Sequence, residues 1–160
     1  MIVSNSTPLI NFAAINRLDI LEQLFDTVVI PPAVTYEVLE GSHRYPSMTA
    51  IREASCIAKH DIGNMMLRDA LLLELDPGEA EAITLALEQK ADLLLLDEMA
   101  GRTIAESYDL AFTGSIGCLI KAKQSGIIPA VKPLMDAMRD QARFWLNPRL
   151  YARILQEQGE

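Results

Sequence analysis

The sequence has 160 residues, of which 50% are hydrophobic and 22% are charged, and its formal net charge is −8. This composition excludes a disordered chain and predicts a single globular domain over residues 1–160 with its own hydrophobic core. The negative charge argues against a protein that holds nucleic acid through general basicity, although an acidic site that carries a metal stays compatible with it.

In chain order, short apolar or β-branched runs alternate with segments in which apolar residues recur at helical spacing. Pro8 and the pair Pro31-Pro32 stand where a helix begins after a strand. The first half is predicted to contain a strand over 1–4, helices over 8–13 and 17–25, a strand over 27–30, a helix over 32–39, a polar loop over 41–47, a helix over 48–54 and a strand over 56–58.

The second half continues this alternation. Its predicted elements are helices over 64–75 and 79–89, strands over 93–96 and 111–112 separated by a helix over 98–108, a helix that ends at Gly126, and helices over 131–143 and 148–158. The run Leu93–Leu96 is wholly apolar, as in a strand that is buried on both faces. The pattern predicts an α/β fold, a three-layer α/β/α arrangement with a central parallel sheet.

Polar side chains follow the predicted strands at the edge where parallel strands end. Right-handed crossovers bring these carboxyl ends together. Asn5 follows the first strand, Asp97 and Glu98 follow the leucine strand, Glu37 lies one turn into a helix, and Glu79 begins the helix before the leucine strand. Such oxygen donors suit a hard divalent cation, which can activate water and neutralise phosphoryl charge.

Each of these residues also has a purely structural interpretation. Asn5, Ser6 or Thr7 is suited to cap the helix that Pro8 opens. Glu37 fits a solvated helix face. Glu79 lies in a first helical turn, where an acid favours the helix dipole.

The segments after the leucine strand have similar alternatives. Glu98 fits the start of a helix or a place behind the site. Arg102 lies one turn after Glu98, so it fits either an ion pair within the helix or a contact with the acidic site. The stretch Thr113–Ser115 fits either a helix cap or a backbone cradle for phosphate.

Two further features bear on location. Cys56 and Cys118 have no metal or redox spacing and are too few for a disulfide framework, which predicts reduced cysteines in or near the core of a cytoplasmic protein. The N-terminus lacks the regions of a signal peptide, and no apolar run is long enough to span a membrane. We therefore expect no membrane partner.

A set of short segments, spread over nearly the whole chain, carries a resemblance to a known family. They are Val3–Ile10, Arg17–Leu21, Ile30–Val34 with Glu37–Val38, Leu75–Ile83, Leu96–Glu98 with Gly101–Arg102, Thr113–Gly117 and Ala122–Lys123. In order and spacing they resemble a PIN-like domain, and in particular an uncharacterised prokaryotic branch related to the VapC-type toxins of toxin–antitoxin modules.

The resemblance implies an endoribonuclease that depends on Mg²⁺ or Mn²⁺ and is the toxin-like component of such a module. Matched by position, the catalytic quartet falls on Asn5, Glu37, Glu79 and Asp97, and the last three hold the metal. Asn5 departs from the family, which usually has Asp there. An amide keeps a carbonyl oxygen for metal but loses the charge, so metal affinity should fall.

The resemblance also implies an RNA substrate, an antitoxin protein as partner, and a homodimer. The residues expected to bind the substrate are Ser6, Arg102, Thr113 and Ser115. Two alternatives remain at this stage. One is a catalytically weakened PIN-like module that binds nucleic acid or protein, and the other is a phosphatase-like or receiver-like α/β protein, because such folds also carry acids at strand ends.

Overall fold

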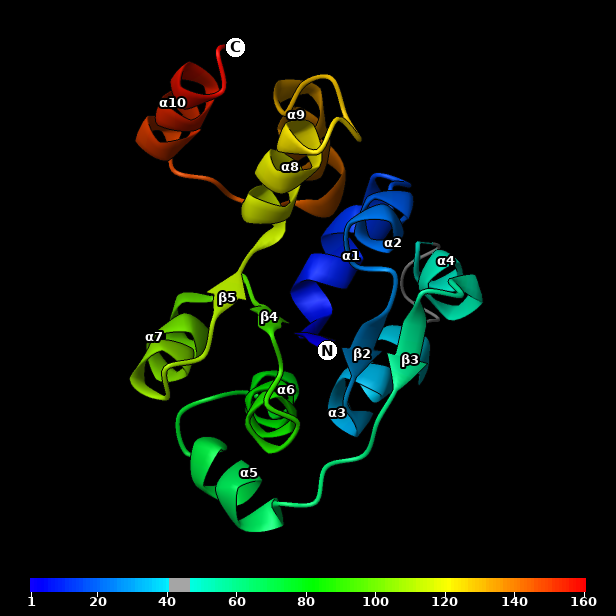
Figure 1. Cartoon of the computed structure of the whole chain (residues 1–160), viewed down its shortest axis with the longest axis vertical. Helices are drawn as coiled ribbons and strands as arrows, with labels where there is room; N and C mark the ends of the chain where they lie inside the picture. The colour runs from blue at the N-terminus through cyan, green and yellow to red at the C-terminus, as the bar shows by residue number, and fades with distance from the viewer. Residues whose placement is uncertain (41–46) are drawn as a thin grey trace.

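The computed structural model describes residues 1–40 and 47–160, and five parallel strands form its central sheet (Figure 1). The strands are β1 (Ile2–Ser4), β2 (Val28–Ile30), β3 (Ile57–Lys59), β4 (Leu93–Leu95) and β5 (Phe112–Thr113). Their order across the sheet is β3-β2-β1-β4-β5. The parallel sheet predicted from the sequence is therefore confirmed.

Helices connect and cover the strands. They are α1 (Ser6–Ala14), α2 (Asp19–Phe25), α3 (Pro32–Thr35), the π-helical turn η1 (Tyr36–Glu40), α4 (Met48–Glu53), α5 (Met65–Leu71), α6 (Pro77–Glu88), α7 (Met99–Ser107), α8 (Ser115–Gln124), α9 (Lys132–Ala142) and α10 (Pro148–Glu157). These bounds agree with the predicted elements to within a few residues. Two differences are that the helix expected over 64–75 ends at Leu71 and that the one over 32–39 changes to a π-helical turn.

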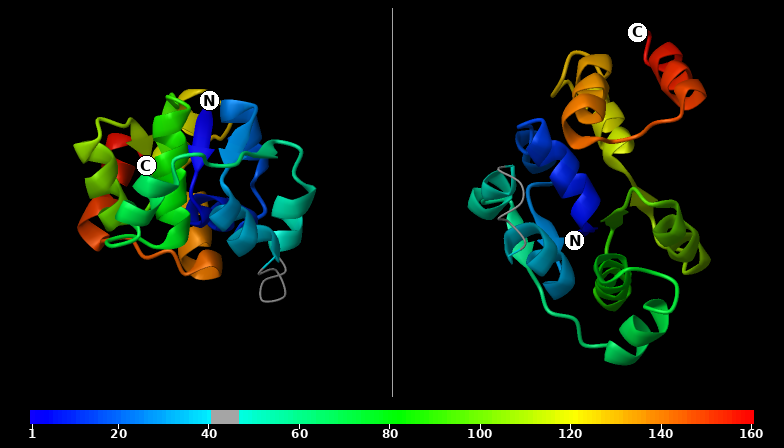
Figure 2. Two further views of the ribbon diagram at one scale, coloured as in Figure 1. Left: turned by 90° about the horizontal axis from the view of Figure 1, so that it is seen from below. Right: turned by 180° about the vertical axis from the view of Figure 1, so that it is seen from behind.

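The helices lie in two layers, one on each face of the sheet (Figure 2). Successive strand residues point to opposite faces, and the leucine strand illustrates this. Leu95 packs with α1, α2 and α8, whereas Leu94 and Leu96 pack with α6 on the other face. The three-layer α/β/α fold is thus confirmed, and the strand is buried on both faces, as its wholly apolar run predicted.

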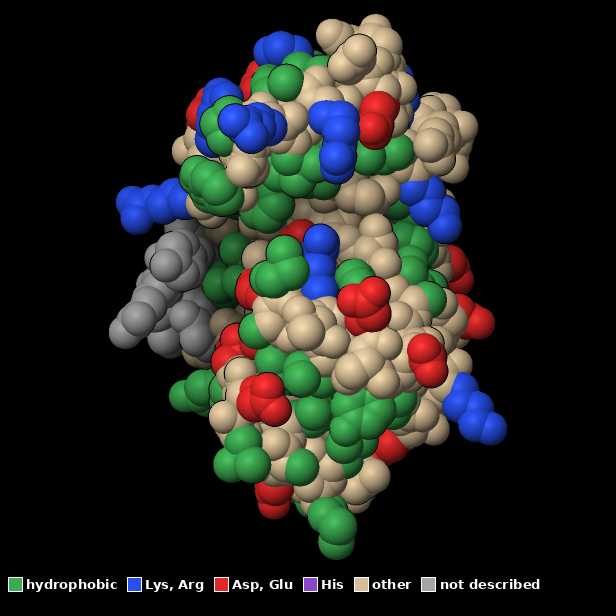
Figure 3. All heavy atoms as spheres, turned by 90° about the vertical axis from the view of Figure 1, so that its left-hand side faces the viewer, with side chains coloured by type: hydrophobic (Ala, Val, Ile, Leu, Met, Phe, Trp, Pro, Cys, Tyr) green, Lys and Arg blue, Asp and Glu red, His purple; other side chains and the backbone are tan. Residues whose placement is uncertain are grey.

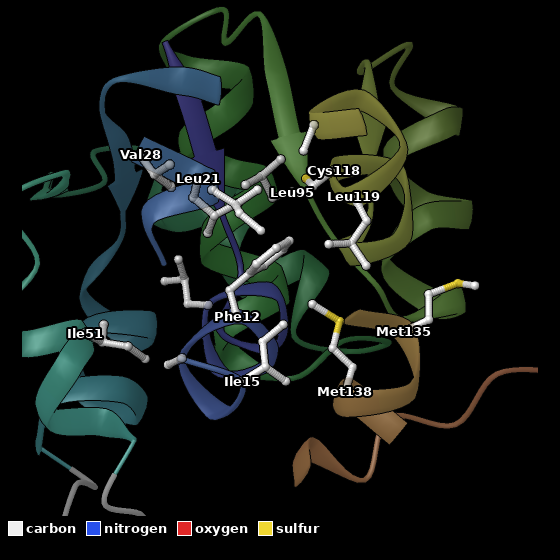
Figure 4. Close-up of a cluster of buried hydrophobic side chains, with 14 of the residues drawn as sticks. Phe12, Ile15, Leu21, Val28, Ile51, Leu95, Cys118, Leu119, Met135 and Met138 are labelled. Atoms are coloured by element: carbon white, nitrogen blue, oxygen red, sulfur yellow. The ribbon is translucent and has the colours of Figure 1, made fainter. Parts of the chain in front are cut away.

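The larger core cluster lies between the sheet and the layer of α1, α2, α8 and α9. Phe12 stands at its centre, with Leu95 and Leu119 beside it (Figure 4). Cys118 belongs to this cluster, and both cysteines are buried and free. The loop expected over 41–47 falls outside the described residues except for Ser47.

The order of the strands creates a crevice at one point of the sheet edge. After β1 the chain builds β2 and β3 on one side, and then it returns to add β4 and β5 on the other. The carboxyl ends of β1 and β4 therefore lie side by side at the place where the direction of winding reverses. In open α/β sheets, ligands bind at this place.

None of the helices in the described part of the chain combines the length and the apolar character that crossing a membrane requires.

Candidate functional site

Asn5 occupies the crevice between β1 and β4. Its backbone amide donates a hydrogen bond to the carbonyl oxygen of Leu95, 3.0 Å away, which ties the end of one strand to the other. The side chain is not a cap for α1, although Asn5 stands at the capping position. Instead, Nδ2 donates to Glu98 Oε2 at 3.2 Å, while Oδ1 is buried and finds no hydrogen-bond donor in the described part of the chain; the residue is 2% exposed.

Glu37 approaches Asn5 from the π-helical turn η1. Turns of this kind are rare and are often found at functional sites. The Ser6 hydroxyl donates to Glu37 Oε2. A Cβ atom on residue 78 would lie 2.9 Å from both Asn5 Oδ1 and Glu37 Oε1, so both oxygens pack against the backbone of residue 78, and only glycine fits there without displacing them.

Glu79 has a different role for each of its carboxylate oxygens. Oε2 accepts the Asp76 amide at 3.3 Å and the Glu79 amide donates to Asp76 Oδ1 at 2.8 Å, which forms a capping box at the start of α6. Oε1 is buried and accepts no well-aligned hydrogen bond from the described residues, and it would lie 2.9 Å from a Cβ on residue 101. Burial raises the pKa of this carboxyl, although the nearby Gly101 amide lowers it. The structural interpretation of Glu79 as an acid at the start of a helix therefore holds, and its capping role involves Oε2 and not Oε1.

Asp97 is held by donors on both of its oxygens. The Ser115 amide and hydroxyl donate at 2.8 and 2.6 Å, and Asn11 Nδ2 donates at 3.2 Å. Arg102 Nη2 lies 3.9 Å from Oδ1. A Cβ on residue 114 would lie 2.4 Å from Oδ1, so the chain passes close to Asp97 at a glycine.

Glu98 stands at the first position before α7, but its carboxylate does not cap that helix. It accepts the Asn5 amide and the Thr7 hydroxyl, one on each oxygen. Glu98 thus stands at the start of α7, as the sequence indicated, and its side chain also contacts Asn5, which the sequence did not indicate.

Burial raises the pKa of three predicted site carboxyls, those of Glu37, Glu79 and Asp97. The negative charge of Asp76 raises the pKa values of Glu37 and Glu79 further, and the charge of Glu98 raises the pKa values of all three by a smaller amount. Hydrogen bonds from Ser6 to Glu37 and from Ser115 to Asp97 act in the opposite direction. Crowded acids with raised pKa values are typical of functional sites, where a cation or a proton compensates their charge.

The predicted substrate-binding residues divide into two groups. Ser6 and Ser115 are buried and hold Glu37 and Asp97 in place. Arg102 and Thr113 line a cavity of about 330 Å³ that reaches to Arg153 on α10. Arg102 donates from Nε to the Leu96 carbonyl at 2.9 Å and pairs with Asp97, so the alternative of an intrahelical pair with Glu98 is not what the described residues form.

Charge is unevenly distributed over the molecule. Seven of the fourteen Lys and Arg residues, but only four of the twenty-two Asp and Glu residues, lie within residues 121–160. On the face drawn in Figure 3, basic side chains gather in the upper part, where α8, α9 and α10 lie, and most acidic ones lie below. The net negative charge therefore does not extend over the C-terminal helices.

Several residues of the site were not found from the sequence. Asn11 and Thr7 lie in a helical segment whose polar residues look like ordinary turns of an amphipathic helix. Gly78 appeared only as part of a turn that starts α6. The sequence offered one signal, the recurrence of glycine at or just before the starts of helices, close to acidic residues. In the structure, a side chain at Gly78, Gly101 or Gly114 would collide with a carboxylate of the site.

The oxygen donors at this edge suit a hard divalent cation. Such ions take one or two carboxylates, carbonyl oxygens and water. Two buried oxygens, on Asn5 and Glu79, have no hydrogen-bond partner among the described residues, and a cation or a water molecule can satisfy such acceptors. Among residues 1–40 and 47–160, however, no three His, Cys, Asp or Glu side chains converge as a ready-made ion cage. A cation would therefore draw on the Asn5 carbonyl oxygen and on water as well as on the acids.

Comparison with known proteins identifies the family of the chain but names no site residue. No curated protein matches the chain significantly. A family model described as a PIN domain matches residues 1–160. This match indicates a nuclease-type module, and PIN domains are in general nucleases that depend on a divalent metal and act on nucleic acid. The chain therefore belongs to the PIN domain family.

Proposed function

We propose that this protein is a Mg²⁺- or Mn²⁺-dependent endoribonuclease in which Asn5, Glu37, Glu79 and Asp97 form the active site. The observation that carries the proposal is the pair of buried, unpartnered oxygens on Asn5 and Glu79 at the crevice of the sheet. Glu37, Glu79 and Asp97 would hold the cation, together with the Asn5 carbonyl oxygen. A cation there supplies activation of water and neutralisation of phosphoryl charge.

The residues of the chain have distinct tasks in this proposal. Ser6 and Ser115 hold the carboxylates of Glu37 and Asp97 in position. Arg102 faces Asp97 and lines the adjoining cavity, where its guanidinium is suited to a phosphate of the substrate. Thr113 lines the same cavity. The basic C-terminal helices would draw an RNA strand toward this side of the molecule.

The test combines metal binding with cleavage. Mn²⁺ is titrated into the protein while thermal stability is followed, and a single-stranded RNA is then incubated with wild type, Glu79→Gln and Asp97→Asn. Asp109→Asn is the matched control, because Asp109 is exposed on the loop after α7. We expect Mn²⁺-dependent cleavage that both site variants lose and the control keeps. Cleavage that survives Glu79→Gln and Asp97→Asn would contradict the proposed site.

The toxin-like role belongs to the same proposal. It implies an antitoxin protein, which a small neighbouring gene for a basic or DNA-binding protein would supply. Induction of the chain in a bacterial host should arrest growth, and co-expression of that neighbour should relieve the arrest. If the protein cleaves RNA but its induction does not affect growth, the toxin role is wrong and the nuclease proposal stands.

A homodimer is proposed as well, and analytical ultracentrifugation at micromolar concentration tests it.

One observation favours a second candidate function. Asn5 carries no charge, and no three acids of the described residues converge. We therefore keep as the alternative a catalytically weakened module that binds nucleic acid or protein. Retained RNA binding, with neither Mn²⁺ binding at millimolar concentration nor cleavage, would favour it.

A further inference from the structure

The side chain of Asn5 is ambiguous by itself, because its amide can turn either face toward the site. Glu98 removes this ambiguity. An ionised carboxylate only accepts hydrogen bonds, so it selects the orientation in which Asn5 Nδ2 faces Glu98 Oε2, at 3.2 Å. Oδ1 then lies on the side away from Glu98, where it and Glu37 Oε1 both pack close to the backbone of Gly78.

The carboxylate of Glu98 accepts fewer hydrogen bonds from the described residues than that of its neighbour Asp97. Asp97 accepts three hydrogen bonds, from Ser115 and Asn11, which involve both of its oxygens, and Oδ1 also lies 3.9 Å from Arg102 Nη2. Within residues 1–40 and 47–160, the side-chain amide of Asn5 and the hydroxyl of Thr7 are the donors to the Glu98 carboxylate. Thr7 holds Glu98 on the side of α1, where the carboxylate faces Asn5 instead of its own helix.

The orientation of Asn5 matters because two buried oxygens, one of them its own, have no hydrogen-bond partner among the described residues. Asn5 Oδ1 and Glu79 Oε1 are buried, and their residues are 2% and 4% exposed. A buried acceptor without a donor costs stability unless something positive fills the space beside it. Hydrogen-bonded carboxylates behind a metal ligand orient that ligand and raise its affinity for the ion.

We propose that Glu98 is a positioning residue of the metal site: it turns the Asn5 carbonyl oxygen toward the cation and supplies the negative charge that the carboxamide lacks. Asn5 and Glu98 together thus do what a single carboxylate at position 5 would do. This inference rests on the cation site of the proposed function, and it assigns to Glu98 a role that differs from that of Asp97, a proposed cation ligand that also anchors α8.

The test is a double-substitution cycle read by Mn²⁺ binding. Isothermal titration compares wild type, Glu98→Gln, Asn5→Asp and the double variant. A neutral Gln no longer forces the amide to turn, so Glu98→Gln should weaken Mn²⁺ binding about 10- to 100-fold. A carboxylate at position 5 presents an oxygen in either orientation and restores the charge. The double variant should therefore recover most of the lost affinity, and Asn5→Asp alone should unfold more easily without metal, because the new carboxylate would face that of Glu98.

Two control variants keep the outcomes distinct. Glu106→Gln is exposed on the same helix, α7, and should leave Mn²⁺ affinity unchanged. Glu79→Gln reports on the cation site itself. If Glu79→Gln abolishes Mn²⁺ binding while Glu98→Gln does not change it, the positioning role is wrong and the proposed function stands. If Glu98→Gln weakens binding and Asn5→Asp brings no recovery, Glu98 acts only on folding. If wild type does not bind Mn²⁺, both proposals are overturned.

Discussion

The carboxylate of Asp97 accepts hydrogen bonds from both the amide and the hydroxyl of Ser115, at 2.8 and 2.6 Å. The Ser115 amide lies in the first turn of α8, where backbone amides have no acceptor within the helix, and Gly114 before it has no side chain that could cap the helix. An acid that follows β4 therefore caps a helix that begins after β5. This contact fixes the spacing between the leucine strand and α8, and with it one wall of the crevice.

Ser115→Ala should accordingly destabilise the protein. The substitution removes the hydroxyl donor and leaves a buried oxygen of Asp97 with fewer partners, which should lower the free energy of unfolding by about 1–3 kcal/mol. Urea denaturation measures this change. Ser125→Ala is the matched control, because Ser125 is exposed at the other end of α8 and should change stability by less than about 0.5 kcal/mol. Equal effects of the two substitutions would contradict the anchoring role of Ser115.

Gly78→Ala should damage the site more than the fold. Its Cβ would lie 2.9 Å from Asn5 Oδ1 and Glu37 Oε1. Replacement of glycine inside a helix by alanine normally stabilises the helix by about 0.5–1 kcal/mol. Any loss of stability in Gly78→Ala would therefore come from the collision of the new Cβ with Asn5 Oδ1 and Glu37 Oε1. We expect the thermal shift caused by Mn²⁺ to disappear.

The control for this variant is Gly63→Ala. The new Cβ would meet only Glu88 Oε1, at 3.6 Å, an ordinary contact. It should keep the Mn²⁺-dependent thermal shift. A Gly78→Ala protein that still responds to Mn²⁺ as wild type does would show that the cation does not need Asn5 Oδ1 and Glu37 Oε1 in their present positions.

The fold was predictable because its signals are local. A wholly apolar run such as Leu93–Leu96 and the helical spacing in 79–89 need no knowledge of the rest of the chain. The parallel sheet followed from the alternation of these elements. The crevice was predictable for the same reason, since residues directly after strands, such as Asn5 and Asp97, must lie at the sheet edge.

The directions of the side chains were not predictable. Glu81 illustrates the reason, because its position on α6 says nothing about what lies opposite. In the structure it is buried, accepts the Ala33 amide at 2.7 Å at the start of α3 and lies 3.4 Å from Arg68. Similarly, the turn of Glu98 toward Asn5 depends on how α1 packs beside β4. Such contacts join segments far apart in the sequence, which periodicity does not report.

Without metal, the acidic site should make stability fall as pH rises. Burial raises the folded-state pKa of Glu37, Glu79 and Asp97. A group whose folded pKa lies above its unfolded value contributes fully below the unfolded pKa, near 4, and the contribution is lost as pH rises through the folded pKa. Urea denaturation from pH 4 upward with a chelator should therefore show a steeper loss for wild type than for Glu79→Gln.

Mn²⁺ should reverse this dependence, because it binds the ionised carboxyls and releases protons. The stabilisation by Mn²⁺ should grow as pH rises through the same range. If the free energy of unfolding of wild type and of Glu79→Gln depends on pH in the same way in the chelator, the pKa of Glu79 is not raised in the folded protein.

The last prediction concerns α10, which Glu160 fastens to the rest of the fold. Its carboxylate accepts Lys123 Nζ at 2.8 Å, the Val131 amide at 2.8 Å and the Lys132 amide at 2.9 Å, so it caps the start of α9. Burial opposes ionisation of Glu160, but these hydrogen bonds outweigh it and lower its pKa from 4.5 to about 2. Since Arg153 on α10 lines the cavity beside Arg102, this contact also sets a wall of that cavity.

Glu160→Ala should therefore loosen α10 and speed hydrogen exchange of its amides at pH 7. Because the folded pKa is lowered, the contribution of Glu160 is present above pH 4.5 and is lost as pH falls toward about 2. The difference between wild type and Glu160→Ala should accordingly shrink between pH 5 and pH 2. Glu157→Ala serves as the control, because its pair with Arg153 is exposed, at 3.7 Å, and contributes little. If α10 exchanges equally fast in both variants at pH 7, the bonds of Glu160 do not hold the helix, and its anchor lies in the apolar contact of Ile154 with the core.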